Sequence, residues 1–448
     1  MDSPVFANLA GLLAAVGGPT NPNTASTTPP APPLKFMLVS THAQQTTGYS
    51  KVSYNIIQEL VRHPEIQVSH FGFQRFFDMP NTYRPYPQNV EVFDPAKQEL
   101  TDSLVPREQG FGFSQLAAAI KRIQPHVVMI YNDAVVVSQF LDKLGDADRA
   151  TFKLVVYLDQ VYSIQRPDLL ARLDGAADAF FTFTAHWRNV LIAQGVRKPV
   201  HVLRHGFDRD VWKPMDRAAL RRKHGIPENL FLMLNLNRNT PRKRHDIVVT
   251  ALAELVTRFP TRPIALLAVC DAGETGGFPI HEIYARELIR RGVPVKDHLH
   301  KLMITKTTLT YTDEMVNELY AMSDIGVTAA DGEGFGLCQF EAMGVGVPQV
   351  VPNIGGFRDF CTRDNSVLVT PKWREYLPLA YSGIGGEAEI VAAEDLCLAI
   401  EEYLLDSELR AKHGAAARAT VLKYSWAQEV AGLVGVLKQM LENTSPSS

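Results

Sequence analysis

Short apolar runs alternate with longer stretches in which apolar residues recur at helical spacing, from Leu34 to near the C-terminus. The runs are rich in β-branched, Leu or Phe residues and nearly continuous, as is typical of strands buried on both faces of a parallel sheet. They are Phe36–Ser40, Val127–Tyr131, Leu154–Leu158, Phe180–Phe183, Phe231–Leu236, Ile264–Val269 and Ile325–Thr328. Alternation of such strands with helices predicts a doubly wound α/β fold.

The stretches between the runs show one apolar stripe each, which predicts amphipathic helices. The clearest stripes consist of Val52, Ile56, Ile57, Leu60 and Val61, and of Met315, Leu319 and Met322. With 448 residues, the chain is too long for one sheet of this kind. We therefore predict two Rossmann-like domains that face each other across a cleft, 34–205 and 206–424, joined by a polar connector that contains Gly206 and Pro214.

The first 33 residues stand apart from this pattern. Their second half, Gly17–Pro33, is rich in Gly, Pro, Asn, Ser and Thr, so it buries too little apolar surface to offset the entropy lost on ordering. We predict a disordered tail at 1–33 that carries no chemistry.

Composition narrows the partners and the compartment. A net charge of −3 gives no reason to expect nucleic acid or an anionic membrane. The four cysteines form no CxxC pair, which favours free thiols in a reducing compartment. No apolar run approaches the ~18 residues that span a bilayer. We expect a soluble, cytoplasmic protein without stable membrane insertion.

The most informative loop follows the last predicted strand. Glycine occupies every second position from Gly332 to Gly336, and a helical pattern then runs to about Gly344. Glycines let the backbone approach a ligand, and a helix N-terminus suits a phosphate. Glu333 in the loop and Glu341 in the early helix bracket this region, where carboxylates can bind sugar or ribose hydroxyls. The alternative is a Gly-rich turn with two solvated glutamates.

A second loop carries four cations directly after the strand Phe231–Leu236. If it lies over a diphosphate, Arg238 can bind it as a bidentate fork and Lys243 as a point charge. We expect Arg242 and Arg244 to face solvent. A solvated basic loop is the alternative. The first strand leads to Gly48, just before a helix expected from near Lys51, but this turn lacks a full GxGxxG and is a weaker signal.

Together these motifs resemble the retaining glycosyltransferases of family 4, which have the GT-B fold. Glu333 and Glu341 match the family's E-x7-E motif within EGFGLCQFEAM, and Arg238 with Lys243 match its diphosphate-binding pair. The connector RHGFD followed by WKP, the segment LYAMSDI and the dipeptide Ser425-Trp426 also match. The resemblance spans roughly Phe36–Leu441 and is strongest in the second half.

The resemblance implies a nucleotide-sugar donor bound mostly by the second domain and an acceptor bound mostly by the first. The acceptor class, whether glycan, lipid or small molecule, stays open. The donor would contact Gly48, Arg238, Lys243, Gly334, backbone amides of Phe335, Gly336 and Leu337, and Glu341. A C-terminal helix at about 425–442 would cross back to the first domain.

The resemblance also implies a reaction with retention and with neither metal nor cofactor, in which Arg238, Lys243 and Glu333 assist catalysis. Asp159 stands where the family often has a histidine near the transferred sugar, so we assign it a sugar-binding or proton-handling role. Asp208-Arg209-Asp210 spells D-x-D, which we interpret as chance. Alternatives on this architecture are a sugar-nucleotide epimerase, a phosphorylase, and a nucleotide-sugar-binding scaffold without turnover.

Overall fold

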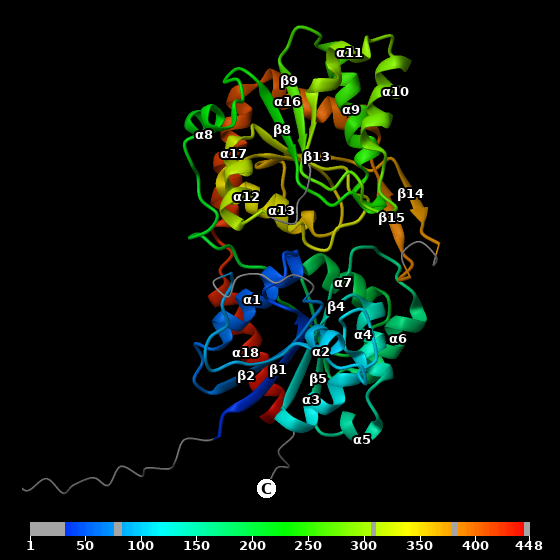
Figure 1. Ribbon diagram of the computed structural model, residues 1–448, viewed down its shortest axis with the longest axis vertical. Coiled ribbons are helices and arrows are strands. Elements are labelled where there is room, and N and C mark those ends of the chain that lie inside the picture. The colour runs from blue at the N-terminus through cyan, green and yellow to red at the C-terminus, as the bar shows by residue number, and fades with distance from the viewer. Residues whose placement is uncertain (1–31, 76–82, 306–310, 379–382, 443–448) are drawn as a thin grey trace, which may run out of the picture. The chain divides into compact units, whose positions relative to one another are not determined.

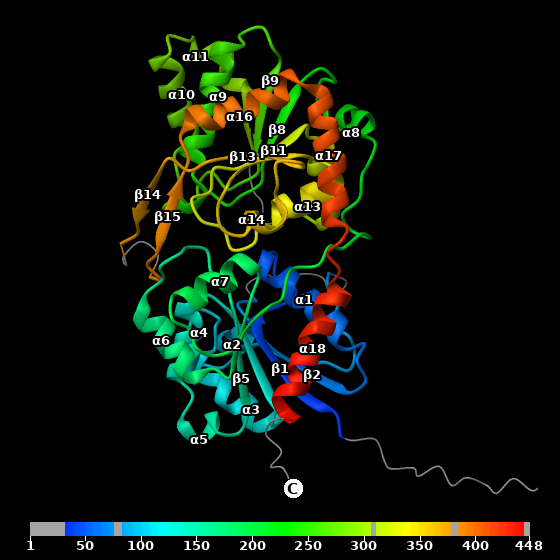
Figure 2. The same cartoon turned by 180° about the vertical axis from the view of Figure 1, so that it is seen from behind.

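The protein contains two parallel α/β sheets, each with helices on its faces (Figures 1 and 2). The structure is a computed structural model that describes residues 32–75, 83–305, 311–378 and 383–442. Both sheets belong to one compact unit, Leu34–Ser448. The predicted fold class of two Rossmann-like domains is therefore confirmed. The predicted tail lies outside the described residues, apart from positions 32 and 33.

The first sheet has seven strands in the order β3-β2-β1-β4-β5-β6-β7. Alternate residues of β1 enter different apolar clusters: Phe36 and Leu38 face one side, and Met37 and Val39 face the other. Both faces are therefore buried, as the continuous apolar runs predict. The strands are β1 (Leu34–Thr41), β2 (Ile66–Phe73), β3 (Glu91–Phe93), β4 (Val127–Asn132), β5 (Lys153–Leu158), β6 (Ala179–Thr182) and β7 (Val200–Val202).

The second sheet has six strands in the order β10-β9-β8-β11-β12-β13. Its strand β8 also divides its residues between two clusters, with Leu232 and Leu234 on one side and Phe231 and Met233 on the other. The strands are β8 (Phe231–Asn235), β9 (Ile264–Ala268), β10 (Leu302–Ile304), β11 (Ile325–Val327), β12 (Gln349–Pro352) and β13 (Ser366–Val369). A separate hairpin pairs β14 (Trp373–Tyr376) with β15 (Glu387–Ile390).

Helices connect the strands, as right-handed parallel crossovers require. In the first half they are α1 (Gly48–Leu60), α2 (Pro95–Thr101), α3 (Leu116–Ile123), α4 (Ala134–Asp142), α5 (Asp146–Arg149), α6 (Pro167–Ala176) and α7 (Ala185–Ala193). In the second half they are α8 (Arg217–His224), α9 (His245–Arg258), α10 (Ile280–Arg290), α11 (Val295–His298), α12 (Asp313–Met322), α13 (Leu337–Val345), α14 (Phe357–Phe360), α16 (Ala393–Leu405) and α17 (Ser407–Val421). The last helix, α18 (Trp426–Glu442), packs against α1 of the first half. Among the described residues, no helix has the length and apolar character needed to cross a membrane.

Both strand orders contain a switch point, which marks where ligands bind. In the first sheet the chain winds outward from β1 through β2 and then, on the other side, from β4 through β5. In the second sheet the switch lies between β8 and β11. Connections leave the two strands of a switch point in opposite directions, which opens a crevice at their carboxyl ends. The Gly-rich loop, the basic loop and the Gly48 turn all follow strands at these two points.

Several elements differ from the sequence pattern for identifiable reasons. Strand β2 was not predicted, because Ser69 and His70 interrupt its apolar run; both are buried, and His70 Nε2 lies 2.9 Å from Ser40 Oγ. Helix α1 begins at Gly48 rather than near Lys51, since Thr47 caps it. Met315, placed on an apolar stripe, is 45% exposed.

Candidate active site

The two loops singled out from sequence lie side by side in the second domain, because the strands they follow, β8 and β11, are neighbours. The basic loop forms a 3-10 turn at Pro241–Lys243. This turn brings Lys243 Nζ into contact with Glu333 Oε2. Arg242 Nη1 donates to the Gly332 carbonyl at 2.6 Å and lies 3.5 Å from Glu333 Oε2. We call Glu333, Lys243 and Arg242 the Glu333 cluster.

In the Glu333 cluster the carboxylate is buried and its two cations are half-buried. Burial opposes ionisation of Glu333, but Lys243 and Arg242 outweigh it, so the pKa of this carboxyl lies below its ordinary value. Burial, with Arg242 as a second cause, lowers the pKa of Lys243. The cluster thus holds two cationic side chains and one carboxylate at the carboxyl end of the sheet.

The three arginines of the basic loop differ in how far their side chains are exposed, and two of them are less exposed than we expected. Arg238 is the exposed one: its side chain is 75% accessible and contacts Glu274 on the surface. Arg242 and Arg244, which we expected to face solvent, are half-buried, and Arg244 pairs with Asp246 at 2.8 Å. That expectation was wrong, because the 3-10 turn and the left-handed Arg244, with φ +48°, turn Arg242 towards the Gly-rich loop.

The Gly-rich loop packs closely against both domains. The Trp187 indole Nε1 donates to the Gly334 carbonyl at 2.7 Å. Gly336 precedes α13 with φ +93°, where a Cβ would lie 2.3 Å from the Phe357 ring. No side chain caps the first turn of α13, so its amides, from Leu337 onward, remain available to an anion. Phe335 is buried against the His205 ring, with centroids 4.3 Å apart.

Glu341, the second acid of the motif, is occupied by protein groups. Lys51 Nζ from α1 donates to its Oε1 and Oε2 at 2.9 and 3.1 Å, and the Tyr320 hydroxyl donates to Oε2 at 2.9 Å. Glu341 is 2% exposed. A ribose diol therefore reaches this carboxylate only if Lys51 withdraws or shares it.

Lys51 belongs to a larger group of charges that includes residues of both domains. Arg84 Nη2 donates to both oxygens of Asp313 at 3.1 Å, and Lys51 lies 3.5 Å from Asp313. Burial would favour neutral Lys51, but Glu341 and Asp313 outweigh it and raise its pKa. We call Glu341, Lys51, Asp313 and Arg84 the Glu341 cluster. Sequence reasoning singled out only Glu341, since Lys51 stands 290 positions away from it.

Asp159 follows β5 and contacts the helix that begins at Gly48. The Tyr49 hydroxyl donates to Asp159 Oδ2 at 2.5 Å. Burial raises the pKa of Asp159 to about 6, although Tyr49 and Arg242 act in the opposite direction. A Cβ at Gly48 would lie 3.6 Å from Leu337, so the first turn of α1 adjoins the start of α13. Tyr49 was not among the predicted residues.

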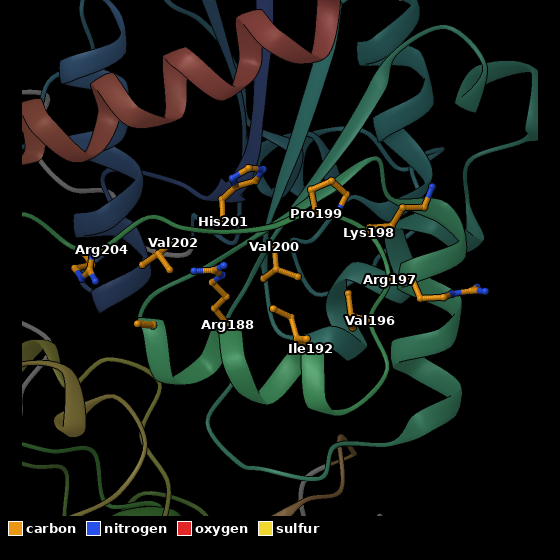
Figure 3. Close-up of a pocket in the computed structure, with 11 residues that line it drawn as sticks. Arg188, Ile192, Val196, Arg197, Lys198, Pro199, Val200, His201, Val202 and Arg204 are labelled. Atoms are coloured by element: carbon orange, nitrogen blue, oxygen red, sulfur yellow. The ribbon is translucent and has the colours of Figure 1, made fainter. Parts of the chain in front are cut away.

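One cavity of the structure lies away from the predicted site residues, and another lies beside them. A cavity of about 750 Å³ lies beside α7 and β7 (Figure 3), and none of the predicted site residues lines it. Its lining includes Arg188, Arg197 and Lys198 together with aliphatic side chains. A smaller pocket of about 280 Å³ is lined by Lys51, Arg84, Asp313, Leu337 and Glu341, among others. The smaller pocket lies beside the first turns of α13 and the Glu341 cluster, and the Glu333 cluster lies on the loop that leads into the same helix. We therefore place the candidate site around the amino end of α13.

A metal centre is not evident in the part of the chain that the structure describes, where no three His, Cys, Asp or Glu side chains gather as ligands. Within Asp208-Arg209-Asp210, the Asp208 Oδ1 accepts the backbone N–H groups of Asp210 and Val211 at 3.0 and 3.2 Å. Asp208 therefore has a local role in shaping the connector between the domains.

The fold with these switch-point loops is that of GT-B glycosyltransferases. HepE from Anabaena, solved with UDP and glucose, superimposes with a TM-score of 0.66 at 17% identity, covering 91% of this chain and all of that one. Sucrose-phosphate synthase from Thermosynechococcus elongatus gives 0.66 at 16% identity, over 92% of this chain and all of the other. At these identities the similarity establishes the fold alone.

The second half of the chain is also similar in sequence to glycosyltransferases. Residues 216–420 match the family model described as glycosyl transferases group 1. D-inositol 3-phosphate glycosyltransferase 2 of Catenulispora acidiphila is 27% identical over 205 residues, 42% of this chain and 45% of that protein. The corresponding enzyme of Geodermatophilus obscurus is 27% identical over 243 residues, 54% of this chain and 48% of its own. The chain thus spans about half the length of these relatives.

Proposed function

We propose that this protein is a family 4 glycosyltransferase that moves a sugar from a nucleoside-diphosphate sugar to an acceptor hydroxyl. The observation that carries the proposal is the convergence of Lys243, Arg242 and Glu333 beside the uncapped amino end of α13. Cations and free helix amides at a switch point form an environment for a diphosphate. The match of residues 216–420 to a glycosyltransferase family model covers this region.

The cations would act on the leaving group. As the glycosidic bond breaks, negative charge grows on the diphosphate, and preorganised cations stabilise it without reorganisation, by several kcal/mol. We assign this task to Lys243 and the amides of α13, and Arg238 is long and exposed enough to join once a ligand is present. We propose that these groups do the work a metal does elsewhere, and that no metal or other cofactor is needed.

The two glutamates would bind hydroxyls. Glu333, held by Lys243, faces the sugar, and Glu341 accepts hydrogen bonds from the ribose diol after Lys51 gives way. We propose retention of anomeric configuration, with the leaving phosphate taking the acceptor proton, because the family resemblance implies it. We also place the reaction in the cytoplasm, since the four cysteines are free and three of them are buried.

The first experiment is ligand binding by the full-length protein. Thermal shifts with UDP, GDP, ADP and their glucose conjugates are compared between wild type, Lys243→Ala and Lys412→Ala, an exposed lysine on α17. UDP-glucose comes first, because the similar HepE structure contains UDP and glucose. A shift lost only in Lys243→Ala supports the donor site. Absence of any shift in wild type would contradict the proposal.

Turnover separates an enzyme from a binding scaffold. The nucleotide that stabilises the protein is supplied as its sugar conjugate with candidate acceptors, starting with inositol phosphate, on which the named relatives act. NMR of the product reports the anomeric configuration, and the same assay in excess chelator tests metal independence. Binding without transfer to any acceptor would favour the scaffold, and an inverted product would contradict retention.

A further inference from the structure

Tyr49 is fixed in an orientation that serves Asp159. It is the second residue of α1, whose start is set by the Thr47 cap. Its ring packs on Tyr131 with centroids 5.0 Å apart, and its hydroxyl donates to Asp159 Oδ2 at 2.5 Å. Burial and the neighbouring Asp159 carboxylate raise the pKa of Tyr49 well above its ordinary value, so it stays a proton donor.

The second oxygen of Asp159 has no protein partner. Oδ1 is buried and makes no hydrogen bond within the described residues. It points at the Gly-rich loop, since a Cβ built on Gly334 would lie 2.1 Å from it. Buried acceptors are nearly always paired, so an unpaired carboxylate oxygen that faces the Gly-rich loop indicates a missing hydrogen-bond donor. Only glycine at position 334 leaves room for the carboxylate.

The charges around Asp159 determine which kind of hydrogen-bond donor can pair with its Oδ1. Arg242 faces it from the basic loop, while Glu333 faces it from the Gly-rich loop and Asp133 from the amino end of α4. The Tyr131 ring of β4 lies nearby as well. Three carboxylates and one guanidinium repel a phosphate but suit a neutral hydroxyl, which donates one hydrogen bond and brings no charge.

We propose that Tyr49 is the positioning residue of the site: it holds Asp159 so that Oδ1 accepts a hydrogen bond from a hydroxyl of the transferred sugar. This inference rests on the proposed function and adds to it a residue that neither the motifs nor the family resemblance identified. The hydrogen bond from Tyr49 also favours the ionised form of Asp159, which is the form that accepts.

The pairing is tested without any sugar through thermal stability as a function of pH. The folded pKa of Asp159, about 6, lies above the ordinary value, so its contribution to stability is complete below about pH 4 and is lost as the pH rises through about 6. The melting temperature of Asp159→Asn should therefore rise relative to that of wild type as the pH increases from 4 to 8. In Tyr49→Phe the ionised Asp159 carboxylate loses the hydrogen bond from the Tyr49 hydroxyl. The pH midpoint of the loss of stability should therefore lie higher than in wild type.

Turnover then tests the role in the site. Tyr49→Phe should lower kcat about tenfold or more, with little change in the donor KM. The acidic limb of its pH–rate profile should move upward, and in Asp159→Asn that limb should vanish. Tyr284→Phe is the matched control, because it also removes the hydroxyl of a buried tyrosine, one that donates to the His298 carbonyl and not to Asp159. Its rate and profile should remain those of wild type.

The outcomes separate this inference from the proposed function. A wild-type protein that neither binds nor uses any nucleotide sugar overturns the proposed function, and the sugar ligand with it. An active wild type whose pH midpoints, in stability and rate, are the same in Tyr49→Phe overturns the positioning role alone. If Tyr49→Phe does not fold, Asp159→Asn decides: an unchanged acidic limb there overturns the inference.

Discussion

The two glutamates of the Gly-rich segment have seven residues between them in sequence but are neutralised in different ways. Glu333 is paired with Lys243 and Arg242, both from the loop after the adjacent strand of its own sheet. Glu341 is paired with Lys51, which comes from the first helix of the other domain. The Glu333 cluster therefore needs only the second domain, whereas the Glu341 cluster exists only while the two domains touch.

This difference has a functional consequence. In the proposed function, a donor site built from the Glu333 cluster would be preorganised in one domain, with its cations in place before a ligand arrives. The carboxylate of Glu341 becomes available only when Lys51 gives way, so its use is coupled to the contact between α1 and α13. Substitutions that remove one cation from each cluster should therefore have opposite effects on donor binding.

The largest effect is expected from Lys243→Ala. In the proposed donor site the substitution removes a cation from the diphosphate and leaves Glu333 with Arg242 as its remaining cation, so donor affinity should fall by about 1.5–3 kcal/mol, or roughly 10- to 150-fold. Titration calorimetry with the nucleotide found by thermal shift measures the change. Lys243→Arg, which keeps a cation, should recover part of the affinity, and an unchanged dissociation constant in Lys243→Ala would exclude this lysine from the site.

Lys51→Met should have the opposite effect and strengthen nucleotide binding. The substitution removes the competitor for Glu341, so nucleotide affinity should rise about tenfold, for a change on the order of 1 kcal/mol. The same variant should melt at a lower temperature, because Glu341 is left buried without its cation. Glu341→Gln is the companion variant and should weaken binding. Weaker binding in Lys51→Met would instead show that this lysine contacts the nucleotide directly.

A smaller effect is expected from Arg238→Ala. The exposed pair that Arg238 forms with Glu274 contributes at most about 1 kcal/mol to folding, so stability should hardly change. Donor affinity should fall several-fold, less than in Lys243→Ala, since Arg238 must first leave Glu274 and be ordered by the ligand. Calorimetry on both variants under the same conditions compares them. An affinity loss in Arg238→Ala equal to that in Lys243→Ala would contradict the ranking.

The smallest effect concerns pH and the Glu333 cluster. The pKa of Glu333 is held below its ordinary value, so its pairing stabilises the fold above the ordinary glutamate pKa of about 4.3 and this contribution is lost as the pH falls through the folded value. The difference in melting temperature between wild type and Glu333→Gln should therefore shrink as the pH falls below about 4. A constant difference down to pH 3 would mean that Glu333 is not held ionised by its neighbours.

The basic loop shows how far sequence reasoning reaches. Its place after an apolar strand and the presence of Lys243 in it were enough to predict a charged site at the carboxyl end of β8. The diphosphate role of Arg238 stays a prediction, but Arg242, which we expected to face solvent, has its side chain 3.5 Å from Glu333 Oε2. Pro241 and the left-handed Arg244 set the direction of the turn, and such a direction follows from backbone torsions rather than from the order of cations.

The first domain was harder to predict because its site residues come from separate turns. Asp159 was singled out because it stands where the resembling family often has a histidine, but Tyr49 is 110 positions away and has the sequence pattern of an ordinary helix residue. Lys51 had no signal either, since a lysine in the second turn of an amphipathic helix usually faces solvent. Nothing in the spacing of these residues indicates that α1 meets both Asp159 and α13.

The sequence by itself determined the alternation of buried strands and helices, the division into two sheets, and the loops in which glycine, lysine and glutamate gather. These features depend on local preferences and on periodicity, which a linear chain displays directly. Only the tertiary structure decided which charge meets which: Lys243 with Glu333, Lys51 with Glu341 and Tyr49 with Asp159. The physical reason is that hydrogen bonds and ion pairs form over about 3 Å in space, and that distance is set by how separate elements pack.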